Sequence, residues 1–559
     1  MRLHSGGTVA DHRQASGRPS CTGDCFPRSP YNNHTDRLAS SIVTSSSDRF
    51  AKLLEVPAKA EDFKDNTIRS GAYALGGEAA DFALRLGSLV ILARLLLPEH
   101  FGLLSMVTAI TAIGERFKDL GLMSATIQSP SLNHRQSSTL FWVNATIGAA
   151  LMIVISALAY PIAYFYHDSR LAYITIAIAS TFLWSGAANQ HHALLRRSMR
   201  YRTIAILQLT ASAGSIAIAV ILAVKGLGYW ALVAREVTRS ALLSAGAWLS
   251  FPWIPGLPSN LKEVRRMLRF GVDITAVNVL HLFTQGLDQI LIGKVFGPEK
   301  LGFYRQGYQL ALAPLSQISY PIRVVAESAL SRLQDDATRY RNYYHSIVKT
   351  VTIGTLPLGL FMTVYAEEIV TVALGQRWLP AAPVFGILGL ASCLRPAAET
   401  AGAVMVSRGL SRRFLWLGLL SAASFTILVF ACLPFGTEGV AFAHLLSLWL
   451  LLGPKLHWSF KATPIRVRDF FAALAKPAVA SLTMSVFLIL LKAYAFAGAA
   501  RLSLALGAVL APVVFLLTLV SLPGGTPEVF NLGRDLAAAL FGGAIRKPSS
   551  RADDGCIAK

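Results

Sequence analysis

Long apolar stretches recur along most of this 559-residue chain, from about residue 70 to residue 522, and they constrain its fold more than any other feature. Each stretch is close to the ~20 residues that a helix needs to cross ~30 Å of hydrocarbon. Hydrophobic residues make up 53% of the chain and charged residues only 15%, which is typical of membrane proteins rather than of soluble domains. The sequence therefore predicts an all-α, polytopic membrane protein.

We expect about 14 membrane-spanning helices, because each apolar stretch is long enough to cross a bilayer once. The predicted spans are residues 70–95, 101–127, 138–166, 171–194, 204–224, 227–252, 267–295, 301–328, 346–374, 380–406, 413–433, 437–459, 471–496 and 501–522.

Basic side chains in the connecting loops predict how these helices are oriented. The net charge of +21 comes from residues that gather in alternate loops, not in one patch, so binding to nucleic acid is not expected. The other loops are short and hold isolated charges. By the positive-inside rule, the clustered side and both termini are cytoplasmic. The clusters are Arg196, Arg197, Arg200 and Arg202; Lys262, Arg265 and Arg266; Arg332, Arg339 and Arg341; Arg408, Arg412 and Arg413; and Lys461, Arg466 and Arg468.

The order of the spans suggests two lobes and two tails. We expect a disordered cytoplasmic tail at 1–66, a six-helix lobe at 67–252, a cytoplasmic linker at 253–266, a second six-helix lobe at 267–459, an extra helix pair at 460–523 and a cytoplasmic tail at 524–559. The first tail is polar and lacks apolar periodicity. The five cysteines show no spacing typical of disulfides or of a metal site, and no cofactor is expected.

One short motif occurs twice at a fixed offset. ARLLLPEHFG at 93–102 is matched two hundred positions later by GKVFGPEKLG at 293–302, so that Arg94, Pro98, Glu99 and Gly102 correspond to Lys294, Pro298, Glu299 and Gly302. A weaker match joins RRSMR at 196–200 with SRGLS at 407–411. Six spans separate equivalent points, so the two halves have the same orientation and a pseudo-twofold axis along the membrane normal is expected. The Pro and Gly residues suggest a tight turn, with Gly easing the start of the second helix.

Many ionisable residues fall inside the predicted spans. Such a group costs at least ~2.5 to 3.5 kcal/mol in hydrocarbon, so it should face protein or water. The structural alternative is a set of internal ion pairs, such as Asp81 with Arg85 or Arg395 with Glu399. For the set as a whole, a hydrated cavity is the stronger prediction. The excess of arginine favours an anionic substrate, because guanidinium groups bind phosphate oxygens in bidentate fashion.

Several longer segments resemble the Wzx-type polysaccharide flippases of the multidrug/oligosaccharidyl-lipid/polysaccharide exporter superfamily. They are DQILIGKVFGPEKLGFYRQGYQLALAPLSQISYPI at 288–322, SRLQDD at 331–336, RWLPAAPVF at 377–385, ARLLLPEHFGLLSMV at 93–107 and GYWALVARE at 228–236. The resemblance implies two six-helix lobes around a central cavity in the bacterial cytoplasmic membrane. It also implies a substrate, an undecaprenyl-pyrophosphate-linked oligosaccharide that is turned from the cytoplasmic to the periplasmic leaflet. A polysaccharide polymerase and a chain-length regulator are the candidate protein partners.

We expect alternating access, in which the cavity receives the polar headgroup while the lipid tail stays in the bilayer. The substrate-binding candidates are Arg85, Arg116, Arg305, Gln309, Tyr320, Arg323 and Arg395. The candidates for coupling to protons or sodium are Glu78, Asp81, Asp273 and Asp288, because a buried carboxylate can change protonation when its surroundings rearrange.

Other functions remain open at this stage. A drug or toxin extruder and a lipid II flippase belong to the same superfamily. A membrane glycan polymerase or ligase also has a dozen spans, but it needs catalytic groups on sizeable extracytoplasmic loops. Here those loops are a few residues long, and no nucleotide-binding motif is present in the sequence. We therefore expect a transporter with no catalytic residues.

Overall fold

The computed structural model describes residue 50 and residues 60–118, 121–129, 131–259, 264–265, 286–461, 463–495 and 500–523. Within these ranges the regular structure is helical. The first group of helices, called the N lobe, comprises α2 (Ala60–Leu95), α3 (Pro98–Phe117), α4 (Leu122–Gln128), α5 (His134–Ala157), α6 (Ala159–Tyr166), α7 (Arg170–Arg197), α8 (Tyr201–Val224) and α9 (Tyr229–Ser250).

The second group, called the C lobe, comprises α11 (Leu287–Arg332), α12 (Ala337–Val364), α13 (Ala366–Ala373), η3 (Gln376–Ala381), α14 (Ala382–Ser407), α15 (Ser411–Cys432), η4 (Leu433–Phe435) and α16 (Gly436–Phe460). Two more helices follow, α17 (Val467–Ala495) and α18 (Ala500–Ser521). Eight helical segments among the described residues are long and apolar enough to cross a membrane. The chain is therefore a multi-pass membrane protein.

The described helices overlap the predicted spans, but α2 begins at Ala60 and α12 at Ala337, before the predicted starts at 70 and 346, and the second predicted span is divided between α3 and α4. Of the seventh predicted span, 267–295, only the part from residue 286 onward lies within the described residues. It forms the first segment of α11, and the second segment, which is the eighth predicted span, starts after Gly297 with φ 82° and ψ 178°. The total of about 14 spans stays a prediction, as do the domain boundaries.

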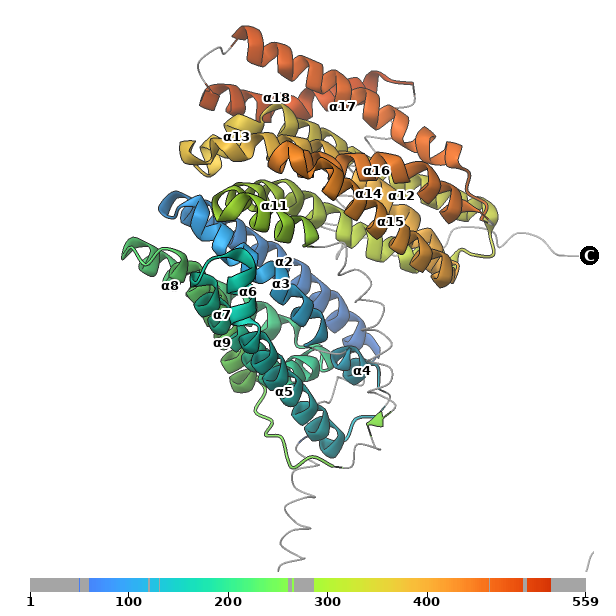
Figure 1. Cartoon of the computed structure of the whole chain (residues 1–559). Helices are drawn as coiled ribbons and strands as arrows, with labels where there is room; N and C mark the ends of the chain where they lie inside the picture. Colours follow the sequence, from blue (N-terminus) through green and yellow to red (C-terminus); the bar gives the residue numbers. More distant parts are fainter. Residues whose placement is uncertain are drawn as a thin grey trace, which may run out of the picture.

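The two lobes form a V. In Figure 1 they lie side by side near α2, α3 and α11 and separate toward the opposite end, where α4 and α15 lie. A continuous apolar core joins them at the closed end, including Leu92, Phe101, Ile292 and Trp378. Further along the V each lobe has its own core. Within the described part of the chain, this shared core therefore holds the two lobes together at the closed end.

The repeated motif forms the crossing between the lobes. A Cβ atom added at Gly102 would lie 1.7 Å from the carbonyl oxygen of Pro298, and one added at Gly302 would lie 2.0 Å from the carbonyl oxygen of Pro98. Contacts that are reciprocal in this way are what a twofold axis requires. The turn at Pro98 is tight, as predicted, but the role expected for glycine was wrong. Glycine is needed because the backbone of the other lobe occupies the space of its side chain, which the sequence of one half cannot reveal.

A second pair of elements repeats this symmetry. The eight-residue α6 directly follows α5 in the N lobe, and the eight-residue α13 directly follows α12 in the C lobe. Figure 1 shows α6 and α13 on opposite sides of the α2, α3 and α11 group. The duplication thus extends beyond the motif that revealed it.

The extra helix pair is fixed to the C lobe at both ends of α17. Lys492 forms a 2.7 Å salt bridge with Glu368 of α13, and Asp469 forms a 2.5 Å salt bridge with Arg341 of α12. An apolar cluster that includes Tyr365, Leu488 and Phe515 fills the space between these ends. The pair is therefore expected to move with the C lobe.

The predicted disordered tail, 1–66, lies outside the described residues except at Phe50 and from Ala60, where α2 begins. Phe50 is 3% exposed and its ring lies 5.6 Å from that of His134 and 5.9 Å from that of Trp253. At this position, therefore, the chain packs against the N lobe, while the expectation of a disordered tail over the rest of 1–59 lies outside the described residues. The predicted C-terminal tail, 524–559, lies outside the described residues.

Candidate functional site

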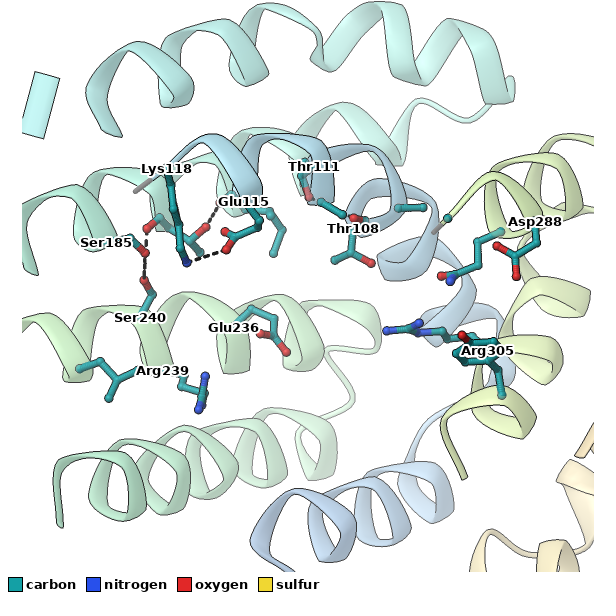
Figure 2. A pocket seen from close by; sticks show the side chains of 18 of the residues that line it. Thr108, Thr111, Glu115, Lys118, Ser185, Glu236, Arg239, Ser240, Asp288 and Arg305 are labelled. Carbon is teal, nitrogen blue, oxygen red and sulfur yellow. Dashed lines mark hydrogen bonds and ion pairs between the residues drawn. The ribbon is translucent and has the colours of Figure 1, made fainter. Parts of the chain in front are cut away.

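A polar cavity of about 550 Å³ lies between the lobes, directly beyond the glycine crossing. Figure 2 shows Glu115, Lys118, Glu236 and Arg239 of the N lobe facing the same space as Asp288 and Arg305 of the C lobe. Hydroxyl groups also line the N-lobe wall, together with a few apolar side chains. The hydroxyl groups belong to Thr108, Thr111, Thr181, Ser185 and Ser240. The cavity therefore offers both charged and sugar-compatible hydrogen-bonding groups.

A second cavity of about 360 Å³ continues into the C lobe between α11 and α14. Arg305 and Tyr308 line both cavities, so they mark the junction between them. The second cavity also contains Gln309 and Arg395. Two arginines that were predicted from sequence as substrate ligands thus line two adjoining cavities, Arg305 both of them and Arg395 the second.

Most charges in the first cavity have a protein partner close by. Glu115 lies 2.5 Å from Lys118, and Glu236 lies 2.6 Å from Arg235. Arg239 reaches Asp81 at 3.6 Å. Among the described residues, Arg305 forms no hydrogen bond and no salt bridge, although it is half-buried. Arg305 is therefore the cation in this cavity best placed to bind an anion.

Asp288 lies at the C-lobe edge of the cavity and is 3% exposed. Its carboxylate accepts a 2.6 Å hydrogen bond from the hydroxyl of Tyr304 and lies 3.3 Å from Nε2 of His444. The Tyr304 hydroxyl is also 3.1 Å from the same His444 nitrogen. These three side chains come from both segments of α11 and from α16, so they form a buried group in which a proton can be exchanged.

Asp81 is the centre of a different cluster, within the N lobe. It is fully buried, forms salt bridges with Arg85 and Arg239, and accepts a hydrogen bond from Ser212. Arg85 also lies 3.3 Å from Glu78. This cluster joins α2, α8 and α9, so it holds the N lobe together in the way that the ion-pair alternative predicted.

The structure places the predicted site residues in several locations. Arg305, Gln309, Arg395 and Asp288 line one of the two cavities. Arg85, Glu78, Asp81, Arg116 and Arg323 line neither of them; Arg85, Glu78 and Asp81 belong to the N-lobe cluster, and Arg116 and Arg323 are exposed on α3 and α11. Arg395 lies 3.1 Å from Glu399, the pair expected from their spacing. Asp273 and the side chain of Tyr320 lie outside the described residues.

Four side chains in or beside the cavity were not among the predicted site residues. Glu236 and Arg239 are charged residues inside a predicted span. Glu236 is the last residue of GYWALVARE, and Arg239 lies three residues after it; this position was the signal that the sequence offered. Tyr304 and His444 gave no signal, because an aromatic and a single histidine within apolar helices are ordinary core residues. Only the fold brings them to Asp288.

Replacing Asp81 with asparagine is expected to destabilise the protein by about 1 to 3 kcal/mol, because Arg85 and Arg239 would lose their common carboxylate inside the lobe. Thermal unfolding of the purified protein in detergent measures this, with the exposed Asp335→Asn as the control. An unchanged unfolding temperature would show that the cluster adds nothing to stability.

Comparisons with known proteins agree with this architecture. A family model described as "Polysaccharide biosynthesis protein" matches residues 91–383, more than half of the chain. An "uncharacterized membrane protein in cps region" of Klebsiella pneumoniae is 25% identical over 443 residues, which cover 77% of this chain and 90% of that protein. The lipopolysaccharide biosynthesis protein WzxC of Escherichia coli strain K12 is 23% identical over 351 residues, covering 62% of this chain and 70% of that protein.

A solved structure also shares the fold. The lipid II flippase MurJ, in an inward closed conformation, superposes with a TM-score of 0.66 and 14% sequence identity, over 82% of this chain and 98% of that one. At this identity the similarity establishes the fold alone. The described helices therefore share their overall arrangement with that protein.

Proposed function

This chain belongs to the polysaccharide biosynthesis protein family, and on that premise we propose that it is a flippase for undecaprenyl-pyrophosphate-linked oligosaccharide repeat units. It moves them from the cytoplasmic to the periplasmic leaflet of a bacterial inner membrane, for exopolysaccharide, capsule or O-antigen biosynthesis. Support comes from the family, from the relative named for lipopolysaccharide biosynthesis and from the fold shared with a lipid II flippase. The chain is proposed to transport its substrate and not to react with it.

The observation that carries this proposal is Arg305, a half-buried cation that forms no hydrogen bond or salt bridge among the described residues, in a polar cavity between two lobes. A charge at membrane depth that lacks a salt bridge is costly, so it is expected to meet an ion or a charged substrate. A guanidinium group binds phosphate oxygens in bidentate fashion. We assign the pyrophosphate to the junction of the two cavities, against Arg305 and Arg395.

The sugars are then assigned to the larger cavity. Its hydroxyl groups and paired charges can donate hydrogen bonds to sugar hydroxyls and accept hydrogen bonds from them. The isoprenoid tail is apolar and gains nothing by leaving the bilayer. In this arrangement only the headgroup crosses through protein, and the tail passes through lipid beside the lobes.

The orientation follows from the basic loops. With the clustered arginines in the cytoplasm, the glycine crossing lies at the periplasmic end and the V opens toward the cytoplasm, with both termini there. The described conformation would then receive the substrate from the cytoplasmic leaflet. Transport requires the crossing to open and the other end to close.

Coupling to a cation gradient is assigned to Asp288. A carboxylate that shares hydrogen bonds with Tyr304 and His444, beside Arg305 and Tyr308, would change its protonation or bind a sodium ion as those neighbours move. With Asp288→Asn, transport in proteoliposomes is expected to proceed without acceleration by an imposed proton or sodium gradient. Acceleration equal to that of the wild type and of the Asp335→Asn control would remove Asp288 from the coupling step.

Deletion of the gene in its own host tests the function. The proposal predicts loss of a surface polysaccharide and accumulation of its lipid-linked oligosaccharide in the cytoplasmic leaflet. A drug or toxin extruder would instead change drug tolerance, and a lipid II flippase would be needed for the cell wall. If the gene instead encoded a polymerase or ligase, its deletion would leave unpolymerised oligosaccharide in the periplasmic leaflet. The expected protein partners, a polymerase and a chain-length regulator, act after the flip.

A further inference from the structure

We propose that Arg94 and Lys294 form a twofold-symmetric lock, in which each residue holds the end of a short helix in the opposite lobe and so keeps one mouth of the cavity shut. What the lock regulates rests on the proposed transport function. The contacts themselves are independent of the substrate.

The first half of the lock runs from the N lobe to the C lobe. Arg94, near the end of α2, donates hydrogen bonds to the carbonyl oxygens of Val372 at 2.5 Å and Ala373 at 3.3 Å. These carbonyls belong to the last turn of α13. The guanidinium group therefore binds the C-terminus of a helix from the other lobe.

The second half runs in the opposite direction. Lys294 of α11, the residue that corresponds to Arg94 in the repeat, donates a hydrogen bond to the carbonyl of Phe165 and lies 3.1 Å from Nε2 of His167. Phe165 belongs to the last turn of α6, and His167 is its C-cap. Each lobe thus contributes one cation and one helix end, and the pairing is reciprocal.

The physical basis is the end of the helix. The last carbonyls of a helix have no partner within it, and the helix dipole makes this end negative. A cation that binds there satisfies the carbonyls and the dipole together. It does so regardless of which side chains the short helix carries, so the lock depends on backbone position more than on side-chain identity.

The residue that precedes each cation in the sequence makes a buried contact with an aromatic residue of the opposite lobe. The indole of Trp378, which is fully buried, donates a 2.8 Å hydrogen bond to the carbonyl of Ala93. On the other side, a Cβ atom at Gly293 would lie 3.1 Å from the ring of Tyr166. Each cation is therefore next to a residue whose small side chain lets an aromatic ring of the opposite lobe approach closely.

Symmetry makes the lock cooperative. If the lobes rotate apart about an axis between them, both helix ends move away from their cations in the same motion. The mouth then cannot open by releasing one half alone. This explains why the sequence repeats a cation four residues before the proline, as well as the glycine four residues after it.

Cysteine labelling tests the lock without any substrate. Ala112 lines the cavity, and an Ala112→Cys reporter in a cysteine-free protein is labelled with a membrane-impermeant maleimide in right-side-out vesicles. In the Arg94→Gln/Lys294→Gln double variant, labelling from this periplasmic face is expected to rise at least about tenfold, because two sets of charge-assisted hydrogen bonds are lost. The matched control is Lys225→Gln, which removes an exposed cation at the same end.

The exchange Arg94→Lys/Lys294→Arg supplies the rescue. Both cations remain, so labelling is expected to stay as slow as in the wild type. Labelling that is unchanged in the double glutamine variant, or that rises equally in Lys225→Gln, would overturn the lock. Because no substrate is present, either result leaves the proposed flippase function untouched.

A second measurement decides the matter if the glutamine variant fails to reach the membrane. In Arg94→Cys/Ala373→Cys, a thiol-specific cross-linker is expected to stop transport of the lipid-linked oligosaccharide, and a cleavable version should allow recovery after reduction. Uninterrupted transport by cross-linked protein would show that this contact need not open.

Discussion

Replacing Arg305 with glutamine is expected to reduce transport of the lipid-linked oligosaccharide about 10- to 100-fold. Arg305 is the half-buried cation at the junction of the two cavities, and among the described residues it forms no hydrogen bond and no salt bridge. Glutamine can donate a hydrogen bond but cannot neutralise a phosphate, and a hydrogen bond to a charged group contributes about 1.5 to 3 kcal/mol. Initial rates in proteoliposomes at low substrate concentration measure the loss.

Two further variants separate charge from geometry. Arg305→Lys keeps the charge without the two-pronged guanidinium group, so an intermediate rate is expected. Arg332→Gln removes an exposed cation from the far end of the same helix and should leave the rate unchanged. Equal rates for Arg305→Gln and Arg332→Gln would mean that the cavity does not hold the phosphate.

Replacing Gly102 with alanine is expected to prevent the described conformation from closing. The new Cβ atom would overlap the carbonyl of Pro298, and backbone cannot move aside as a flexible side chain can. Over-packing of this kind costs about 3 kcal/mol, which shifts the balance between closed and open states about 100-fold. We expect transport to fall to a few per cent at most, with the Ala112→Cys reporter labelled from the periplasmic face.

Because Gly102 and Gly302 are related by the twofold axis, the same defect is expected at both positions. Gly302→Ala places its Cβ atom 2.0 Å from the carbonyl of Pro98, so it should reproduce the defect of Gly102→Ala. Gly418→Ala is the matched control, because its Cβ atom meets nothing within 4 Å and alanine favours a helix. A normal transport rate in Gly102→Ala, or a defect in only one of the two variants, would contradict the crossing as described.

The sequence predicted the helices and the duplication because both leave local or periodic patterns. Most predicted spans within the described residues overlap one helix or a pair of consecutive helices, and the motif at 93–102 and 293–302 marks equivalent points. The sequence of one half does not reveal which residues of the other half pack against it. Gly102 and Arg94 acquire their roles from Pro298 and α13, which lie hundreds of residues away along the chain.

The cavity was only partly predictable for the same reason. Charge within a span identified Arg305, Arg395 and Asp288, but it equally selected Asp81 and Arg85, whose charges satisfy each other within the N lobe. Composition cannot separate a paired charge from an unpaired one. That distinction depends on which helices pack together, and it is also why His444 was not recognised as a neighbour of Asp288.

The proposed function depends on one physical event, the passage of a charged, sugar-bearing headgroup between the two lobes and past Arg305. The most direct measurement is the flipping of an undecaprenyl-pyrophosphate-linked oligosaccharide in proteoliposomes, followed by how much of it becomes accessible to a glycosidase outside. Vesicles with the wild-type protein should expose the inner-leaflet substrate, whereas empty vesicles and vesicles with Arg305→Gln should expose little. Equal exposure in all three preparations would contradict the account.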